Sequence, residues 1–246
     1  MSIFYFRSLN ENPGVWDKIT NNTIRVVSLN ISRLKPHMED LKNDSTILKA
    51  DIIHLSETWV TTDPLFEQYG FTMDQVKSDL FQLEGFTADF VSVGKGRGIV
   101  TYSRGTFLHE EDKKEKDYQM TKFRAPNADS IHVYRSAEGS QQSVVENLNQ
   151  LIDPERLTVI TGDFNICLDK KPDNQITSFL CGRGFKQLVT SPTHKAGGRI
   201  DHAYIWDPNT ELSDSSMTQY CPYYSDHDAL CLTLTTKVGF TILFTS

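Results

Sequence analysis

The chain has 246 residues, of which 38% are hydrophobic and 23% are charged, and its formal net charge at pH 7 is −7. This composition is that of an ordinary globular protein, and the length suits one large domain or two small ones. The acidic charge counts against a protein that coats nucleic acid over its whole surface, because phosphates are neutralised by lysine and arginine. It leaves open an enzyme whose acidic residues gather at a metal site.

The cysteines and the chain ends indicate the cellular compartment. The 4 cysteines lie far apart without a CxxC pair, which favours free thiols in a reducing compartment over disulfides or a zinc site. The apolar segments 1–7 and 238–244 are too short to span a membrane. We expect an intracellular protein, nuclear or cytoplasmic, with no membrane contact. Residues 24–236 are expected to form one domain, with an extension at 1–23 and a tail at 237–246.

Short apolar runs rich in valine, isoleucine, threonine and tyrosine predict strands. In chain order, the strands are expected at 24–30, 52–56, 86–93, 99–103, 119–123, 131–134, 157–162, 200–206, 218–223 and 229–235. Helical periodicity predicts helices at 36–48, 141–152 and 172–183, the last with Gly184 just past its end. The charged run 110–117 predicts a solvated loop and the glycine-rich 94–98 a turn. His54 and Cys181 are expected in the core.

The order of these elements indicates the fold class. Many short strands with few helices between them favour two packed sheets with helices outside, in an α/β protein. A doubly wound parallel sheet would need a helix after nearly every strand.

Side chains capable of catalysis stand where the expected strands end. Strand ends at one rim of a scaffold can bring together residues that are distant in sequence. Taken singly, each of these residues could instead cap or stabilise a turn. The side chains at these strand ends are Asn30, Glu57, Tyr134, Asp163, Asn165, Asp226 and His227.

Asp201 is different, because it lies inside the otherwise apolar run RIDHAYI. An unpaired buried carboxylate is costly. Asp201 therefore needs a partner, and His227 is a suitable one.

Together these positions resemble a known family. The resemblance rests on the segments SLNISRL, LSETW, VYRS, GDFN, SPTHKAGGRIDHAYI and YYSDHDAL, which extend in this order from about residue 24 to residue 234. They are similar to the successive motifs of the endonuclease/exonuclease/phosphatase (DNase I-like) superfamily. LVTSPTH and YSDHDA in particular resemble the endonuclease domains of non-LTR retrotransposons and related mobile elements.

The resemblance implies a four-layer α/β sandwich of two mainly antiparallel or mixed sheets flanked by helices, with the site at one end. It also implies a Mg²⁺ or Mn²⁺ site, since hard oxygen ligands suit these ions. Glu57 would be the main metal ligand, with Asn30 and Asp226 near it.

The same resemblance implies catalytic roles. Asp163 and Asn165 would orient and deprotonate the attacking water. His227, held by Asp201, would contact the phosphate and stabilise developing charge. Tyr134 would donate to the phosphate or to the leaving oxygen.

The sequence also departs from the family pattern. Ser32 stands where the family often has an acidic or amide residue, which predicts a weaker or wetter metal shell. The segment GGRI before Asp201 lacks the tryptophan of abasic-site endonucleases, so we do not expect an abasic-site specialist. After Tyr134 comes Arg135 in place of the usual proline, which predicts a different loop.

The substrate is the most open question. We expect a nicking endonuclease acting on DNA, perhaps joined to other mobile-element domains. A phosphoesterase for a small molecule or lipid phosphate and an inactive binding module are the alternatives. Basic residues cluster around the motif loops. The loop before Asp201 could contact a phosphate, or it could simply be a solvated loop. The side chains expected to bind substrate are Arg135, His194, Lys195 and Arg199.

Overall fold

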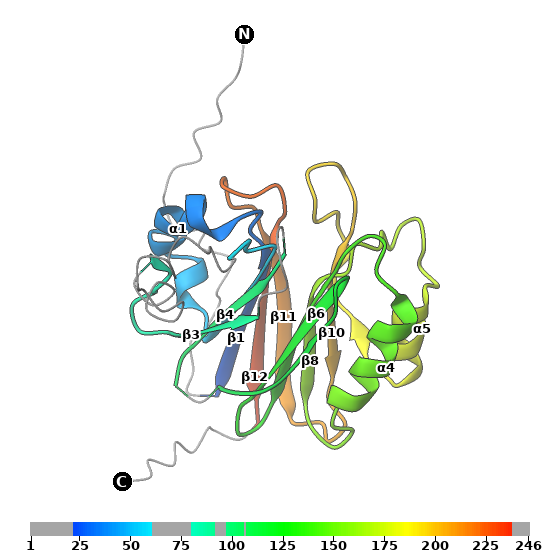
Figure 1. Ribbon diagram of the computed structural model, residues 1–246. Coiled ribbons are helices and arrows are strands. Elements are labelled where there is room, and N and C mark those ends of the chain that lie inside the picture. Colours follow the sequence, from blue (N-terminus) through cyan, green and yellow to red (C-terminus); the bar gives the residue numbers. More distant parts are fainter. Residues whose placement is uncertain (1–21, 61–79, 92–96, 106, 238–246) are drawn as a thin grey trace.

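The computed structural model describes residues 22–60, 80–91, 97–105 and 107–237 (Figure 1). The domain boundaries stay predictions, since the expected tail and nearly all of the extension lie outside the described residues. So does most of the turn at 94–98.

Two six-stranded mixed sheets pack face to face (Figure 1). The first has the order β11-β12-β1-β2-β4-β3 and the second the order β5-β6-β7-β8-β10-β9. The first sheet contains β1 (Thr23–Asn30), β2 (Ile52–Ser56), β3 (Thr87–Val91), β4 (Ile99–Ser103), β11 (Leu212–Tyr220) and β12 (Ala229–Thr236). The second contains β5 (Leu108–Lys114), β6 (Tyr118–Arg124), β7 (Asp129–Arg135), β8 (Thr158–Asp163), β9 (Lys186–Gln187) and β10 (Asp201–Trp206).

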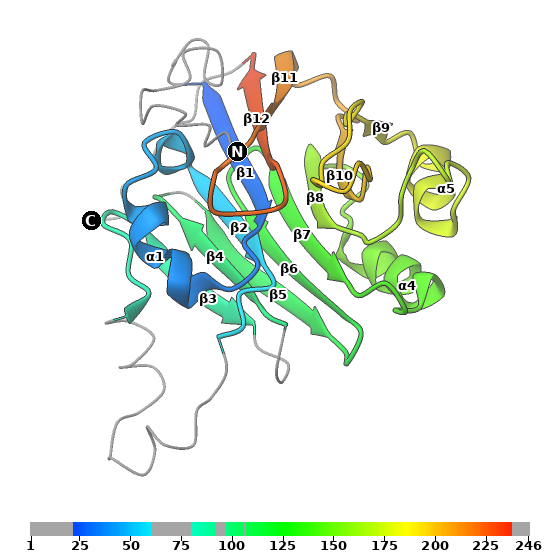
Figure 2. The same cartoon turned by 90° about the horizontal axis from the view of Figure 1, so that it is seen from above.

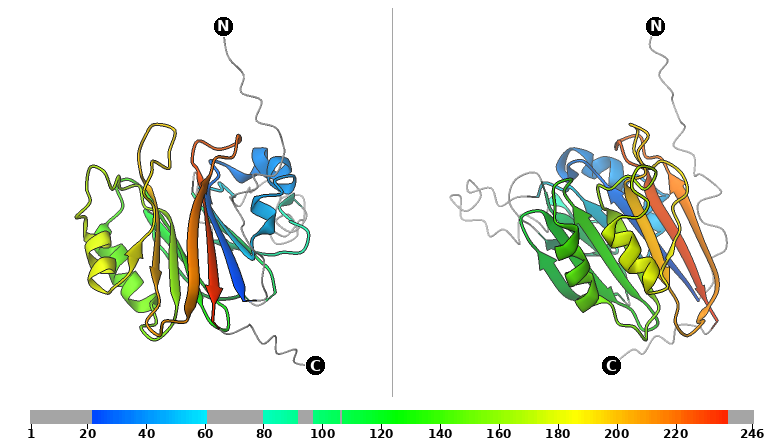
Figure 3. Two further views of the ribbon diagram at one scale, coloured as in Figure 1. Left: turned by 180° about the vertical axis from the view of Figure 1, so that it is seen from behind. Right: turned by 90° about the vertical axis from the view of Figure 1, so that its right-hand side faces the viewer.

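Helices cover the outer faces of both sheets, which confirms the four-layer α/β sandwich. α1 (Leu34–Lys42) and the short 3₁₀ helix η1 (Ile47–Lys49) lie outside the first sheet. α4 (Gln141–Leu151) and α5 (Gln175–Gly182) lie outside the second (Figure 3). Each of these two helices begins at a side-chain cap, because Ser140 accepts from Ser143 N at 3.2 Å and Asn174 from Thr177 N at 3.0 Å.

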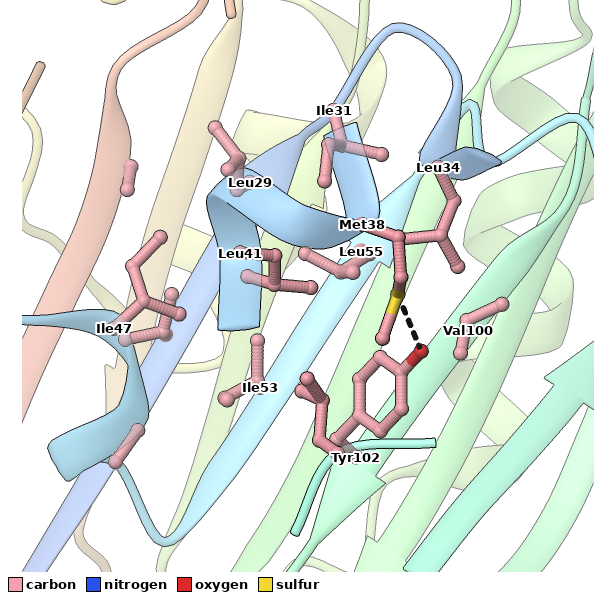
Figure 4. Close-up of a cluster of buried hydrophobic side chains, with 14 of the residues drawn as sticks. Leu29, Ile31, Leu34, Met38, Leu41, Ile47, Ile53, Leu55, Val100 and Tyr102 are labelled. Carbon is pink, nitrogen blue, oxygen red and sulfur yellow. Dashed lines mark hydrogen bonds between the residues drawn. The ribbon is translucent and has the colours of Figure 1, made fainter. Parts of the chain in front are cut away.

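The hydrophobic clusters follow the layers. One cluster joins α1 to the outer face of the first sheet, where Met38 and Tyr102 are in contact (Figure 4). A second joins α4 and α5 to the outer face of the second sheet. The third lies between the sheets. Each apolar face is therefore buried against a neighbouring layer.

The interior between the sheets becomes polar toward one end. Alternate residues of β1 face this interior, and they change from Ile24 and Val26 to Ser28 and then Asn30. His54 and His132 stack there with ring centroids 4.9 Å apart. Burial holds the pKa of both imidazoles well below the ordinary value, so the pair is neutral. The polar end of this interior leads to the strand ends that carry the expected site.

The solvated loop expected at 110–117 is wrong, because this stretch belongs largely to β5 and pairs with β6. β5 is an exposed edge strand, so it lacks the alternation of apolar residues by which strands are recognised. Its charges are paired locally, as in the Lys122–Glu110 salt bridge of 2.8 Å.

Other differences are smaller. The helix expected from 36 to 48 is divided into α1 and η1, and the one expected from 172 begins only after its cap at Asn174. The strand expected at 218–223 extends from Leu212 to Tyr220. His54 is buried as expected, whereas Cys181 is exposed and the expectation for it was wrong. Cys167, Cys181 and Cys231 are free thiols, as expected.

Gly162 should be the least replaceable of the glycines that the structure describes. Its φ is +145°, and a Cβ there would lie 1.8 Å from the carbonyl oxygen of Val133 on the adjacent β7. Gly162→Ala should lower the free energy of unfolding by about 3 kcal/mol or more. Gly182→Ala is the matched control, because a Cβ at Gly182 meets nothing within 4 Å. Its effect should stay within about 1 kcal/mol. Equal stabilities in urea denaturation would contradict this account.

Candidate active site

The expected residues lie where β1, β7 and β8 end, where β10 begins, and in the loops after β2 and β11, all at one end of the two sheets (Figure 2). β8 runs parallel to β7 and antiparallel to β10, and this register aligns Asp163 with Tyr134 on one side and Asp201 on the other. The loop at 190–200 lies at the same end, and a bridge between His194 and His227 links it to the loop that follows β11.

Asp163 lies at the centre of the site and is buried. Its Oδ2 accepts from Asn30 Nδ2 at 2.9 Å and from Asn165 Nδ2 at 3.1 Å, while its Oδ1 accepts from Asn165 N at 2.9 Å. Burial and the negative charge of Asp201 together raise the pKa of Asp163 to about 7, against the opposing effect of His227. A carboxylate with such a pKa can take up a proton near neutral pH.

Asp201 and His227 form the expected pair, with 2.9 Å between Oδ2 and Nδ1. Burial opposes the charge of the imidazole, but the hydrogen bond and the charge of Asp201 overcome it and raise the pKa of His227 to about 9. His227 is therefore an imidazolium at neutral pH. Ligand-type atoms of Asp163, Asp201 and His227 all lie within 4.8 Å of one another.

Glu57 and Tyr134 are joined from opposite sheets. The Tyr134 hydroxyl donates to Glu57 Oε1 at 3.0 Å. Burial raises the pKa of Tyr134, and the negative charge of Glu57 raises it further. The phenol therefore stays protonated and orients Glu57. Among the described residues, Glu57 Oε2 has no hydrogen-bond donor, so it can serve as a ligand.

Ser32 connects Asn30 with Asp226. Its N–H donates to Asn30 Oδ1 at 3.0 Å, and its hydroxyl donates to Asp226 Oδ1 at 3.0 Å. Asp226 Oδ2 lies 3.4 Å from His194 Nε2. Burial opposes ionisation of Asp226, but the bond from Ser32 and the charge of His227 hold its pKa below the ordinary value. The oxygens of Glu57, Asn30 and Asp226 are of the hard kind that suits Mg²⁺ or Mn²⁺, and their role as ligands stays a prediction.

Backbone strain is concentrated at this site. The described non-glycine residues with positive φ are Ser32, Arg33, Glu57, Trp59, Asn165 and Thr210. All except Thr210 belong to loops that carry site residues. Such conformations cost about 1–3 kcal/mol each and persist where the surroundings enforce them, which is typical of functional sites.

Two of the residues expected to bind substrate have partners within the protein. Arg135 is buried, and its guanidinium donates to the carbonyl oxygens of Phe164 at 2.8 Å and Asn165 at 3.2 Å. This favours a role in holding the GDFN loop over contact with substrate. Arg199 forms a salt bridge of 2.9 Å with Asp169 and donates to a backbone carbonyl.

Lys195 and His194 lie closer to the catalytic groups. Lys195 Nζ donates to the carbonyl oxygen of Ser225 at 2.6 Å. The His194 ring meets the His227 ring edge to face, with centroids 4.6 Å apart. Both residues stay candidates for substrate contact.

Three residues that hold the site were not singled out from the sequence. The Ser225 hydroxyl donates to the carbonyl oxygen of Asn30 at 2.6 Å and accepts from His227 N at 3.0 Å. Thr193 Oγ1 accepts from Asp201 N at 3.0 Å. Asp44 Oδ2 accepts from the hydroxyls of Tyr220 and Tyr224, at 3.1 and 2.9 Å, and so anchors the loop that leads to His227. Ser225 and Thr193 belong to the recognised motifs, whereas no sequence pattern distinguishes Asp44.

A cavity of about 800 Å³ adjoins the site. Asn165 and Arg135 line it on the side of the catalytic groups, and the exposed Lys170 and Lys171 line it farther away. The cavity therefore places these two lysines on the same hollow as Asn165, which holds Asp163.

Comparison with known proteins identifies the family. The sequence matches the Endonuclease/Exonuclease/phosphatase family over residues 27–227, and the chain therefore belongs to this family of phosphoesterases. Among curated proteins, no sequence matches it.

Solved structures of the same fold are similar at low identity. The endonuclease domain of TRAS1, a telomere-specific non-LTR retrotransposon, has a TM-score of 0.62 and 17% identity, covering 88% of this chain and 100% of that one. An AP endonuclease from Archaeoglobus fulgidus has a TM-score of 0.58 and 15% identity, covering 87% and 100%. Truncated TDP2 from Caenorhabditis elegans has a TM-score of 0.57 and 16% identity, covering 87% and 98%. At these identities the likeness shows the fold alone. Within the described residues, no helix is both long and apolar enough to cross a membrane.

The protonation of His227 should depend on Asp201. In protein free of divalent metal, the imidazole should titrate near pH 9, as its pKa of about 9 indicates. Asp201→Asn should lower this pKa, because burial disfavours the charged imidazole and the negative charge of Asp201 no longer offsets that effect. The folded-state pKa is raised, so the contribution of His227 to stability is complete below the ordinary value of 6.5 and is lost as the pH rises through 9.

NMR of the imidazole nitrogens measures this titration directly. Asp207→Asn is a control, because Asp207 accepts from Glu211 N and Leu212 N in another loop. An unchanged His227 pKa in Asp201→Asn would show that the pair does not set the charge.

Proposed function

We propose that the chain is a Mg²⁺- or Mn²⁺-dependent endonuclease that nicks DNA, of the kind that mobile elements carry. The observation that carries the proposal is the buried Asp163, held by Asn30 and Asn165 next to the Asp201–His227 ion pair. A base and a fixed cation side by side are what hydrolysis of an anionic diester requires.

The contacts support a role for each residue. Asp163 accepts the proton of the attacking water, and Asn165, which also donates to the carbonyl oxygen of Arg135 at 2.8 Å, keeps the carboxylate in place. The water oxygen then forms a bond to phosphorus as the bond to the leaving oxygen breaks, and the leaving oxygen takes up a proton from solvent water. His227, as an imidazolium, donates to a phosphate oxygen and stabilises the charge that develops there. Tyr134 orients Glu57.

The metal would be held by Glu57, with Asn30 and Asp226 beside it. Enzymes of this family are typically Mg²⁺-dependent, and the donor atoms here are the hard oxygens that this ion prefers. When bound, the ion supplies a positive charge that polarises the phosphate. Ser32 donates hydrogen bonds to Asp226 Oδ1 and to Asn30 Oδ1. These oxygens are therefore less available to an ion, and water would complete more of its coordination.

DNA is favoured over a small ester by the surface beside the site. A strand continues past the scissile phosphate, and its neighbouring phosphates need cationic side chains to hold them. Lys170 and Lys171 line the cavity next to Asn165 and can provide this contact. Cationic side chains at this position could hold a phosphate although the net charge of the chain is −7.

Nicking of supercoiled plasmid tests the proposal. The wild type should nick it with Mg²⁺ and stop in EDTA. Glu57→Ala should lose most activity, because the ion loses its anionic ligand, and Asp163→Asn should lower turnover by about 10²- to 10⁴-fold, because the general base is gone. Glu155→Gln, whose acidic group lies in an exposed loop, controls for loss of charge elsewhere.

A small soluble phosphodiester distinguishes the alternatives. The wild type should cleave it poorly, since it lacks the flanking phosphates whose binding energy assists the reaction. Rapid turnover of this ester without plasmid nicking would show that the substrate is a small molecule and not DNA. Activity toward neither substrate with any divalent metal would favour an inactive binding module.

A further inference from the structure

An exposed aromatic residue stands beside the proposed metal ligand. Trp59, the last residue of the LSETW segment, is 41% exposed and lies two positions after Glu57. The guanidinium of Arg33 stacks on its ring, with Cζ 4.3 Å from the ring centroid. Arg33 is itself exposed. The catalytic roles proposed above use neither side chain.

Both side chains are held by a strained but well-bonded backbone. The φ angles of Arg33 and Trp59 are +103° and +52°. The loop of Arg33 is fixed to that of Trp59, since Arg33 N donates to the carbonyl oxygen of Glu57 at 2.9 Å and Leu34 N to that of Thr58 at 2.9 Å. Trp59 N donates to the carbonyl oxygen of Arg97 at 3.1 Å. The indole is thus presented on a rigid support.

Stability gives little reason for this arrangement. An exposed cation–π pair contributes about 0.5–1 kcal/mol, which is less than the cost of two left-handed backbone conformations. Among the described residues, the Arg33 guanidinium has no carboxylate or carbonyl partner. Its donors are therefore available to a ligand while its plane rests on the indole.

We propose that Trp59 and Arg33 form a binding site for an unstacked nucleobase and its phosphate next to the scissile bond. The inference rests on the proposed nuclease function. The indole stacks on the face of the base, and the guanidinium donates to the phosphate of the same nucleotide. A base within a duplex has both faces covered, so the site takes a base that is unpaired, frayed or turned out of the stack.

Oligonucleotides with single missing bases test the site. Short single-stranded DNAs with a unique cleavage position are prepared with an abasic analogue at each position in turn, and kcat/KM is measured with Mg²⁺. For the wild type, removal of one base next to the cut should lower kcat/KM by about 5- to 150-fold. Trp59→Ala should show a similar loss on the intact strand and no further loss at that position.

Three further variants make the result specific. Trp59→Phe keeps an aromatic face and should retain most of the dependence on that base. Leu108→Ala removes an exposed apolar side chain, 69% exposed, from an edge strand of the other sheet, and it should behave as the wild type. Arg33→Ala should weaken the salt dependence of KM by about one phosphate contact.

The outcomes separate this inference from the proposed function. If the wild type nicks plasmid but its base profile is the same as that of Trp59→Ala, the nucleobase site is wrong and the nuclease stands. If Trp59→Ala lowers kcat/KM equally for intact and abasic strands at every position, the indole only supports the Glu57 loop. If no nucleic acid is cleaved, both proposals fall.

Discussion

The site depends on one hydrogen bond between the two sheets, from Asn30 Nδ2 to Asp163 Oδ2 at 2.9 Å. Asn30 ends β1 of the first sheet and Asp163 ends β8 of the second, and both side chains are buried. A carboxylate in this position would be costly without donors. Asn30 therefore satisfies one oxygen of Asp163 and, together with the Tyr134–Glu57 hydrogen bond, links the two sheets at the catalytic end.

The other groups are arranged around this contact. Asp201 raises the pKa of Asp163 and, through its hydrogen bond, that of His227. At neutral pH, Asp163 can therefore accept a proton while the neighbouring His227 carries a positive charge. Both properties depend on Asp201. Gly162 contributes by allowing β8 to approach β7 so closely that Asp163 aligns with Tyr134.

Much of the fold was predictable because burial imposes a pattern on the sequence. β2 and β4, buried on both faces, were predicted with the correct bounds. β5 was not, because an edge strand exposed to solvent carries no apolar alternation. The pairing of Asp201 with His227 followed from the cost of a charge inside an apolar strand. The roles of Arg135 and Asp44 could not follow, since their partners are backbone carbonyls and tyrosines brought close only by folding.

The central claim is that Asn30 acts through Asp163, and a double-mutant cycle on cleavage tests it most directly. Turnover at saturating DNA and Mg²⁺ is compared for Asn30→Ala, Asp163→Ala and the double variant. If Asn30 positions the base, the double variant should be about as slow as Asp163→Ala alone, because residues that act as a unit are not additive. A loss in the double variant equal to the product of the two single losses would show that the residues act independently, and would contradict this account.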